Sequence, residues 1–294
     1  FMVGYVGSTG RNLFLRSITN LITSVTTNPT TGAGTAVRQF GGRFAEIDYK
    51  TSGGTDMYNS LQSSLQRRFA RGLSLGAQYT WAKELGTSSG SNEATTAQNP
   101  YDLGTEYGRG TFDIRHSLNA TVLYDLPFGH GKAYSLSGPL DLIGGGWQVG
   151  GIVNFRSGVP VDVLITRPDI AYVGNAGTSI AGQTFSSSVV TAGVVQTTAV
   201  ANVPGGGNTR NIRRPNVVRG VNPYLGTGRQ FLNPAAFSTP AAGTFGNARR
   251  NDFTGPSLSQ WDLTRSKSFH VSERASLDFH ADAYNVLNHP NYAN

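Results

Sequence analysis

The sequence of 294 residues contains no cysteine, and charged residues make up only 14% of it. The absence of cysteine excludes a disulfide framework, zinc–thiolate sites and a cysteine nucleophile. The charged fraction lies well below the roughly 25% of an average soluble domain. No apolar run approaches the ~20 residues that a membrane-spanning helix requires. A helical membrane protein and several kinds of catalytic or metal site are therefore excluded.

Glycine is abundant, at 38 residues, and Gly, Ser, Thr and Asn dominate the polar positions. This composition favours many strands joined by long loops. The formal net charge is +7, which raises the possibility of nucleic-acid binding. However, the densest basic cluster is Arg210, Arg213 and Arg214, which lies in a Gly/Pro/Asn-rich loop with no stacking platform. We therefore expect scattered basic residues and no nucleic-acid partner.

Alternation of apolar and polar residues with a period of two recurs along the chain, and it is cleanest at 73–81. There the apolar residues are Leu73, Leu75, Ala77, Tyr79 and Trp81. The segment 59–69 has the same alternation, and 70–72 suits a three-residue hairpin loop. Pairing Phe69 with Leu73 places Leu65 opposite Ala77, and a slip of one residue would mix the two faces.

We expect seven antiparallel strands in all, and a weaker strand candidate at 43–49. The seven lie at 1–6, 59–69, 73–81, 116–126, 147–156, 260–269 and 275–288. Their connections are alternately short and long. The short ones are 70–72, 127–146 and 270–274, and the long ones are about forty residues after the first strand, 85–109 and about 163–257. Short turns at one end and long loops at the other are typical of outer-membrane β-barrels, whose apolar face contacts lipid.

Aromatic residues lie near both ends of the predicted strands. Tyr79, Trp81 and Trp261 are at the long-loop ends, whereas Phe69, Tyr124, Trp147 and Phe269 are near the short turns. A strand from Leu73 to Trp81 spans ~26 Å, or ~19 Å of height at a ~45° tilt. That height approaches the ~25 Å apolar band between the aromatic girdles of such barrels. An odd number of strands cannot close a single-chain bacterial barrel, so we expect further strands to complete it.

Several long stretches resemble the C-terminal barrel region of Oar-like TonB-dependent receptors, and together they cover nearly the whole chain. The stretches are "YNSLQSSLQRRFARGLSLGAQYTWAKEL", "FDIRHSLNATVLYDLPFGHGK", "GGWQVGGIVNFRSGVP", "FLNPAAFSTPAAGTFGNARRN" and "LDFHADAYNVLNHPNY". The resemblance implies an all-β, transmembrane antiparallel barrel of about 22 strands in the outer membrane of a Gram-negative bacterium.

The resemblance also implies energy-coupled uptake of a large or scarce nutrient. Its partners would be outer-membrane lipid, an unidentified substrate at the extracellular loops, and the TonB complex, reached through an N-terminal plug domain. We expect 1–294 to be part of the barrel domain, with the plug, its TonB box and the final strand lying outside this sequence. No energy-coupling residue is therefore assigned to these positions.

One polar cluster stands out as a candidate site. Asp278, His280 and Asp282 share one face of a strand, and pairing Phe269 with Ala275 would place Asp262 opposite Asp282. Carboxylate and imidazole groups could bind a cation there. A polar lumen wall neutralised by basic residues is the favoured interpretation, because charged lumen walls are common. We predict no metal and no cofactor.

The sequence contains no arrangement typical of an enzyme. No G-x-S-x-G elbow presents a nucleophile, and the glycine-rich segment 205–211 lacks the Lys-Ser/Thr of a phosphate-binding loop. Arg67, Arg265 and Lys267 fall on the lipid-facing register, where they can extend towards headgroups. Two alternatives to a transporter are a surface, structural or adhesion protein that binds through 163–257, and a soluble β-rich binding module.

Overall fold

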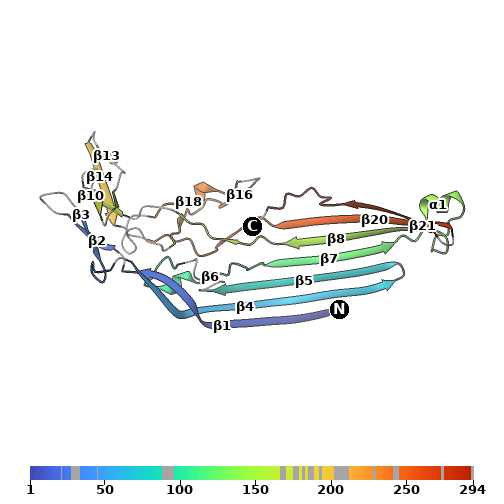
Figure 1. Ribbon diagram of the computed structural model, residues 1–294, viewed down its shortest axis with the longest axis horizontal. Helices are drawn as coiled ribbons and strands as arrows, with labels where there is room; N and C mark the ends of the chain where they lie inside the picture. The colour runs from blue at the N-terminus through green and yellow to red at the C-terminus, as the bar shows by residue number, and fades with distance from the viewer. Residues whose placement is uncertain are drawn as a thin grey trace.

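The computed structural model describes most of the chain, with gaps at the long-loop end. The described residues are 1–20, 22–27, 34–44, 46–87, 96–165, 170–174, 179–180, 183–184, 189–191, 194–201, 212–227, 230–240, 245–272 and 275–292. Long antiparallel strands lie side by side in one extended sheet (Figure 1). Within the described ranges, no helix is long and apolar enough to cross a membrane.

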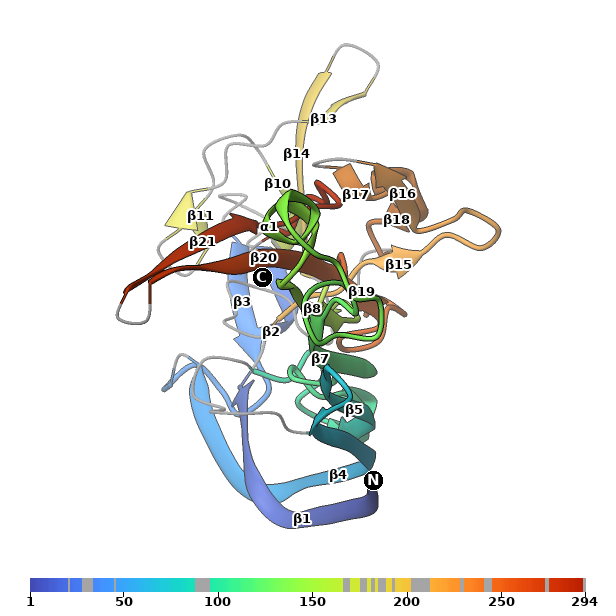
Figure 2. The same cartoon turned by 90° about the vertical axis from the view of Figure 1, so that its right-hand side faces the viewer.

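Seven long strands form the sheet in the order β1-β4-β5-β7-β8-β20-β21, which confirms the predicted all-β antiparallel architecture. Their bounds are β1 (Met2–Thr19), β4 (Ile47–Ala70), β5 (Leu73–Gly86), β7 (His116–Asp125), β8 (Trp147–Arg156), β20 (Leu258–Ser272) and β21 (Ala275–Ala283). A short strand, β6 (Gly108–Arg109), also pairs with β5. The sheet is curved when it is viewed along its strands (Figure 2), and β1 and β21 are its edges.

The two ends of the sheet differ. One end carries the short turns and the helix α1 (Pro139–Gly144), and most of the small elements gather at the opposite, long-loop end (Figure 1). The small elements are β2 (Ile22–Thr27), β3 (Gly34–Arg38), η1 (Leu103–Glu106), β9 (Pro160–Val161), β10 (Ile170–Gly174), β11 (Ser179–Ile180), β12 (Gln183–Thr184), β13 (Val189–Thr191), β14 (Val194–Ala201), β15 (Asn216–Val217), β16 (Tyr224–Thr227), β17 (Gln230–Leu232), η2 (Pro234–Ala236), β18 (Phe237–Ser238) and β19 (Phe253–Thr254).

The register predicted between β4 and β5 is confirmed for most of its length, because Leu61 pairs with Trp81 and Leu65 with Ala77. The turn itself is shorter than predicted. The register shifts near the end of β4, so that Ala70, rather than Phe69, pairs with Leu73. Arg71 and Gly72 then form a two-residue turn with φ of 53° and 80°. Two positive φ values match the right-handed twist of the paired strands, which favours this turn over a three-residue loop.

The strands β1 and β4 are much longer than the predicted segments 1–6 and 59–69. Their pairing continues past irregularities between Arg11 and Leu15. Asn12 has φ of 57°, a conformation that Asn tolerates. Opposite this irregularity, a Cβ on Gly54 would lie 2.8 Å from the Leu13 carbonyl oxygen. Asn and Gly, which indicate a loop in the sequence, here allow a bulge within a continuous strand.

The predicted register between β20 and β21 was wrong by two residues. Phe269 pairs with Leu277 instead of Ala275, and Asp282 pairs with Thr264 instead of Asp262. The reason is that β20 extends into the predicted link 270–274 as far as Ser272, which pairs with Ala275, the first residue of β21. The register shifts between His270 and Ser272, and every pair further along the two strands is displaced with it.

The Arg71–Gly72 turn predicts a selective effect of a single methyl group. Gly72→Ala should lower the free energy of unfolding by about 1–2 kcal/mol, because alanine is strained at positive φ. Its Cβ would also lie 3.0 Å from the Asp125 carbonyl oxygen. Gly42→Ala is the control, since its Cβ meets no atom within 4 Å. Urea titration of the protein refolded into lipid vesicles measures both variants, and equal stabilities would contradict the assigned turn.

Candidate functional site

The strand registers place apolar side chains in continuous rows on one face of the sheet. One row crosses five strands and consists of Leu65, Ala77, Ala120, Val153 and Trp261. The next row on this face adds Leu75, Val122, Gly151, Leu263 and Ala283. Because side chains alternate along each strand, every second residue contributes to this surface. We call it the apolar face.

The opposite, polar face carries a row of hydrogen-bonding side chains next to the first of those apolar rows. Ser64, Gln78, Asn119, Asn154 and Gln260 lie in register across five adjacent strands. Neighbouring strands are ~4.8 Å apart, so the four amides form a regular series of donors and acceptors. Such a lining suits a water-filled interior and contact with polar solutes.

The loops fold over the polar face at the long-loop end of the sheet. Ser60 and Ala82 are paired on that face and are only 3% and 7% exposed. Their neighbours Leu61 and Trp81 are paired on the apolar face and are 42% and 50% exposed. At the same height of the sheet, therefore, the side chains of the polar face are covered and those of the apolar face are not. This is the reverse of a soluble protein, in which water favours the opposite arrangement.

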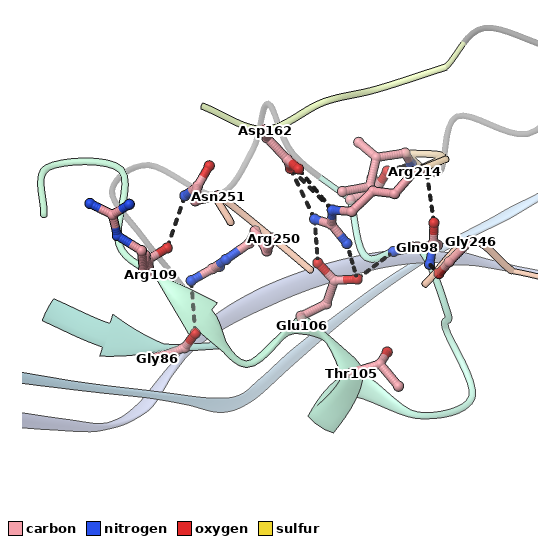
Figure 3. Close-up of polar contacts among 12 residues, drawn as sticks. Gly86, Gln98, Thr105, Glu106, Arg109, Asp162, Arg214, Gly246, Arg250 and Asn251 are labelled. Atoms are coloured by element: carbon pink, nitrogen blue, oxygen red, sulfur yellow. Dashed lines mark hydrogen bonds and ion pairs between the residues drawn. The ribbon is translucent and has the colours of Figure 1, made fainter. Parts of the chain in front are cut away.

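A buried ionic cluster holds these loops together, and Arg214 is at its centre (Figure 3). The Arg214 guanidinium donates two parallel hydrogen bonds to Glu106, from Nη1 to Oε1 at 3.0 Å and from Nη2 to Oε2 at 2.9 Å. It also donates from Nε to Oδ1 of Asp162 at 2.9 Å. Glu106 ends η1, and Asp162 follows β9. The cluster thus ties three loop segments that are far apart in the sequence.

Gln98 extends the same cluster through its amide. Its Oε1 accepts from the Arg214 backbone N at 2.7 Å, and its Nε2 donates to the Gly246 carbonyl at 3.1 Å. Its own backbone N donates to Oε1 of Glu106 at 2.8 Å. Burial works against the charge of Arg214, but the hydrogen bonds and charges of Asp162 and Glu106 outweigh it and raise the pKa of the guanidinium. The cation is therefore fixed in its charged form.

A second set of buried polar groups joins the cluster to the sheet. Arg250 donates from Nη2 to the carbonyl oxygen of Gly86 at the end of β5, at 2.8 Å. Burial, and then the nearby charge of Arg214, lower the pKa of Arg250. Asp113 is fully buried and accepts from Nε of Arg109 at 2.7 Å and from the Glu84 backbone N at 2.8 Å. The loops are thus attached to the strands by charge-assisted hydrogen bonds.

The ionic cluster differs from the prediction, in which Arg213 and Arg214 belong to a loop with scattered basic charges. In the structure, Arg213 lies over the Phe245 ring at 5.8 Å, whereas Arg214 is buried. The acidic partners of Arg214 are 108 and 52 positions away in the sequence. No local pattern signals such a contact. The one sequence feature that points to a buried ion pair is a basic residue in a weakly charged chain.

The four predicted lumen residues lie on the polar face, but they do not form one site. Asp262 accepts from the Asn285 backbone N at 2.8 Å and from Nε2 of Gln260 at 2.9 Å. Asp278 accepts from the Ser268 hydroxyl, and His280 pairs with Ser266 across the strands. Asp282 is opposite Thr264. Within the described part of the chain, no group of His, Asp and Glu residues could hold a metal ion.

The predicted girdle residues occupy the expected strand positions, although some strands extend beyond them. Trp81 and Tyr79 lie in β5, which continues to Gly86, and Trp261 lies near the start of β20. The others are Phe69, just before the Arg71–Gly72 turn, Tyr124 at the end of β7, Trp147 at the start of β8 and Phe269 near the end of β20. Tyr79 also contacts His116, with Oη 2.8 Å from Nδ1. Their role at the lipid interface stays a prediction.

One of the three basic residues on the apolar face differs from expectation. Lys267 is buried, and its Nζ donates to the carbonyl oxygens of Leu142 at 2.7 Å and Gly145 at 2.5 Å. It therefore caps the end of α1 instead of extending freely towards headgroups. Arg265 is exposed, with its guanidinium 3.6 Å from the centroid of the Trp147 ring.

A curved antiparallel sheet with an exposed apolar face and a loop-covered polar face is the wall of a transmembrane β-barrel. The comparison with family models agrees. All of residues 1–294 match a model described as an outer membrane beta barrel domain. The chain belongs to this family, and the protein is located in the outer membrane. No curated protein and no solved structure matches the chain.

The two faces predict opposite responses to the same substitution. Ala77→Arg should lower the free energy of unfolding in lipid by roughly 2–4 kcal/mol, because it places a charge within the apolar band. Gln78→Arg, one residue away on the polar face, should change it by much less. Urea titration of protein refolded into lipid vesicles compares the two. Similar losses for both variants would show that the faces are misassigned.

The Arg214 cluster predicts that the loops depend on one buried cation. Arg214→Met leaves the Glu106 carboxylate unpaired, and breaking such a pair costs about 3–5 kcal/mol. Hydrogen exchange of the Gln98 backbone amide, which donates to Glu106, should accelerate accordingly. The exposed Arg219, changed to Met, is the control. The double variant with Glu106→Gln should lose less than the sum of the single changes, and strict additivity would contradict the cluster.

Proposed function

We propose that the protein is a TonB-dependent receptor whose barrel takes up a large or scarce nutrient across the outer membrane. The observation that carries the proposal is the position of the loops, which are fixed over the polar face by the Arg214 cluster. Loops held at the mouth of a barrel can bind a solute before it enters the interior. The resemblance of the strand and loop motifs to Oar-like receptors supports the same function.

The polar face supplies groups suited to this role. The amides of Gln78, Asn119, Asn154 and Gln260 can each donate and accept hydrogen bonds, and they lie in one row across the wall. A polar nutrient, or a plug domain that occupies the interior, could bind them. We further propose that additional strands continue the wall beyond the edges β1 and β21, because an unpaired strand edge is not stable in lipid. We propose no enzymatic activity.

Adhesion or another surface role is the second candidate, and exposed aromatic side chains on the loops favour it. These side chains are Phe40, Phe44, Tyr101, Tyr107 and Phe112. Aromatic residues are enriched where proteins bind partners. In this alternative the long-loop end, including the region around 163–257, binds an external partner and no solute passes through the barrel.

A genetic and biochemical comparison separates the two functions. If the protein is a TonB-dependent transporter, strains lacking it or lacking TonB should share a growth defect on the same limiting nutrient. The intact protein should also be cross-linked in cells to the C-terminal domain of TonB. A strain with normal growth on every nutrient tested, no TonB cross-link and impaired attachment to surfaces or cells would contradict transport and support adhesion. Arg214→Met should weaken whichever function depends on the loops, and Arg219→Met should not.

A further inference from the structure

The helix α1 exposes an unusual amount of apolar surface for its size. It has six residues, and Leu140, Leu142 and Ile143 are 68%, 62% and 73% exposed. It lies in the link between β7 and β8 at the short-turn end of the sheet (Figure 1). An isolated six-residue helix is unstable in water, so contacts with the sheet must hold it in place.

Two side chains from the sheet hold α1 by its backbone. Nζ of Lys267 donates to the carbonyls of Leu142 and Gly145, and Nε1 of Trp147 donates to the carbonyl of Ile143 at 2.8 Å. Lys267 and Trp147 are paired with each other. They belong to the apolar face, because they continue the strand alternation of Leu263 and Val149. The helix is therefore attached to the side of the sheet that faces lipid.

The helix itself carries little exposed charge. Its one ionisable residue is Asp141, and Oδ1 of that residue accepts from the His130 backbone N at 2.9 Å. The ammonium group of Lys267 is turned towards the helix carbonyls. Next to them, Arg265 stacks on Trp147 and remains exposed. The resulting surface has three apolar side chains and, near them, the accessible guanidinium of Arg265 at the periplasmic rim.

We propose that α1 is an interfacial anchor that inserts Leu140, Leu142 and Ile143 into the periplasmic phospholipid leaflet of the outer membrane. Lipid is the group that covers these side chains, because the helix continues the lipid-facing apolar face up to the level where headgroups begin. Arg265 is placed to bind the phosphate of a headgroup, as cations near an interface do. The anchor fixes the height of the barrel in the membrane, and it does so whether the protein is a transporter or an adhesin.

The chain contains no cysteine, so one engineered thiol can report the position of α1 in the intact protein. Leu142→Cys is labelled with an environment-sensitive fluorophore, and the protein is reconstituted into phosphatidylethanolamine–phosphatidylglycerol vesicles. Lipids brominated near the headgroup end of their acyl chains should reduce the emission about twofold, because an interfacial helix lies at that depth. Lipids brominated near the chain ends should quench it less.

Three comparisons make the result decisive. The same label at Ser135→Cys, an exposed position of the same link, should not be quenched. A label at Leu65→Cys on the apolar face should be quenched more by the deeper bromines. Adding Lys267→Met to Leu142→Cys should reduce the shallow quenching while the Leu65 signal is unchanged, because Lys267 positions the helix. A label at Leu142 that remains unquenched in folded protein would overturn the proposal. The proposal would also be overturned if the label became buried only after periplasmic protein was added and was still not quenched by the lipids.

Discussion

The absence of water inside a bilayer is the constraint on which this structure depends. Every backbone N–H and C=O group within the hydrocarbon layer must be bonded to another strand, and the side chains that face outward must be apolar. The five inner strands of the sheet are paired on both sides, with nearly unbroken registers, and their apolar rows, such as Leu65, Ala77 and Ala120, lie on one face. The polar side chains are left for the other face, where water, solutes or other protein segments can satisfy them.

Different interactions stabilise the extracellular end. Beyond the apolar band the strands β1 and β4 continue, and loops fold inward over the polar face. They are held together by ring contacts among Tyr224, Phe237 and Phe253 and by several buried charges, with Arg214 between Glu106 and Asp162. A buried ion pair contributes little net stability compared with apolar packing, but its loss is costly and its geometry is specific. It is therefore suited to fixing which loop segments meet at the mouth of the barrel.

The periplasmic end combines tight turns with one helix. The Arg71–Gly72 turn uses two left-handed residues, so that the strands can reverse within the shortest distance. By contrast, the link between β7 and β8 is long enough to form α1, which Lys267 and Trp147 hold against the apolar face. A barrel wall needs only short turns on this side, and an apolar helix there adds contact with the lipid interface.

Local periodicity and loop lengths were sufficient to predict the strand alternation, the two faces, the pairing of Leu61 with Trp81 and the outer-membrane location. Other features depend on contacts between distant residues or on left-handed backbone, and they became visible only in the folded chain. They are the bulge at Asn12, the shift that places Thr264 opposite Asp282, and the capping of α1 by Lys267. The site around Arg214 is of the same kind, because its partners are separated from it by long stretches of sequence. Periodicity is a local property that a strand must show, whereas a buried charge is paired only when the folded chain brings its partners together.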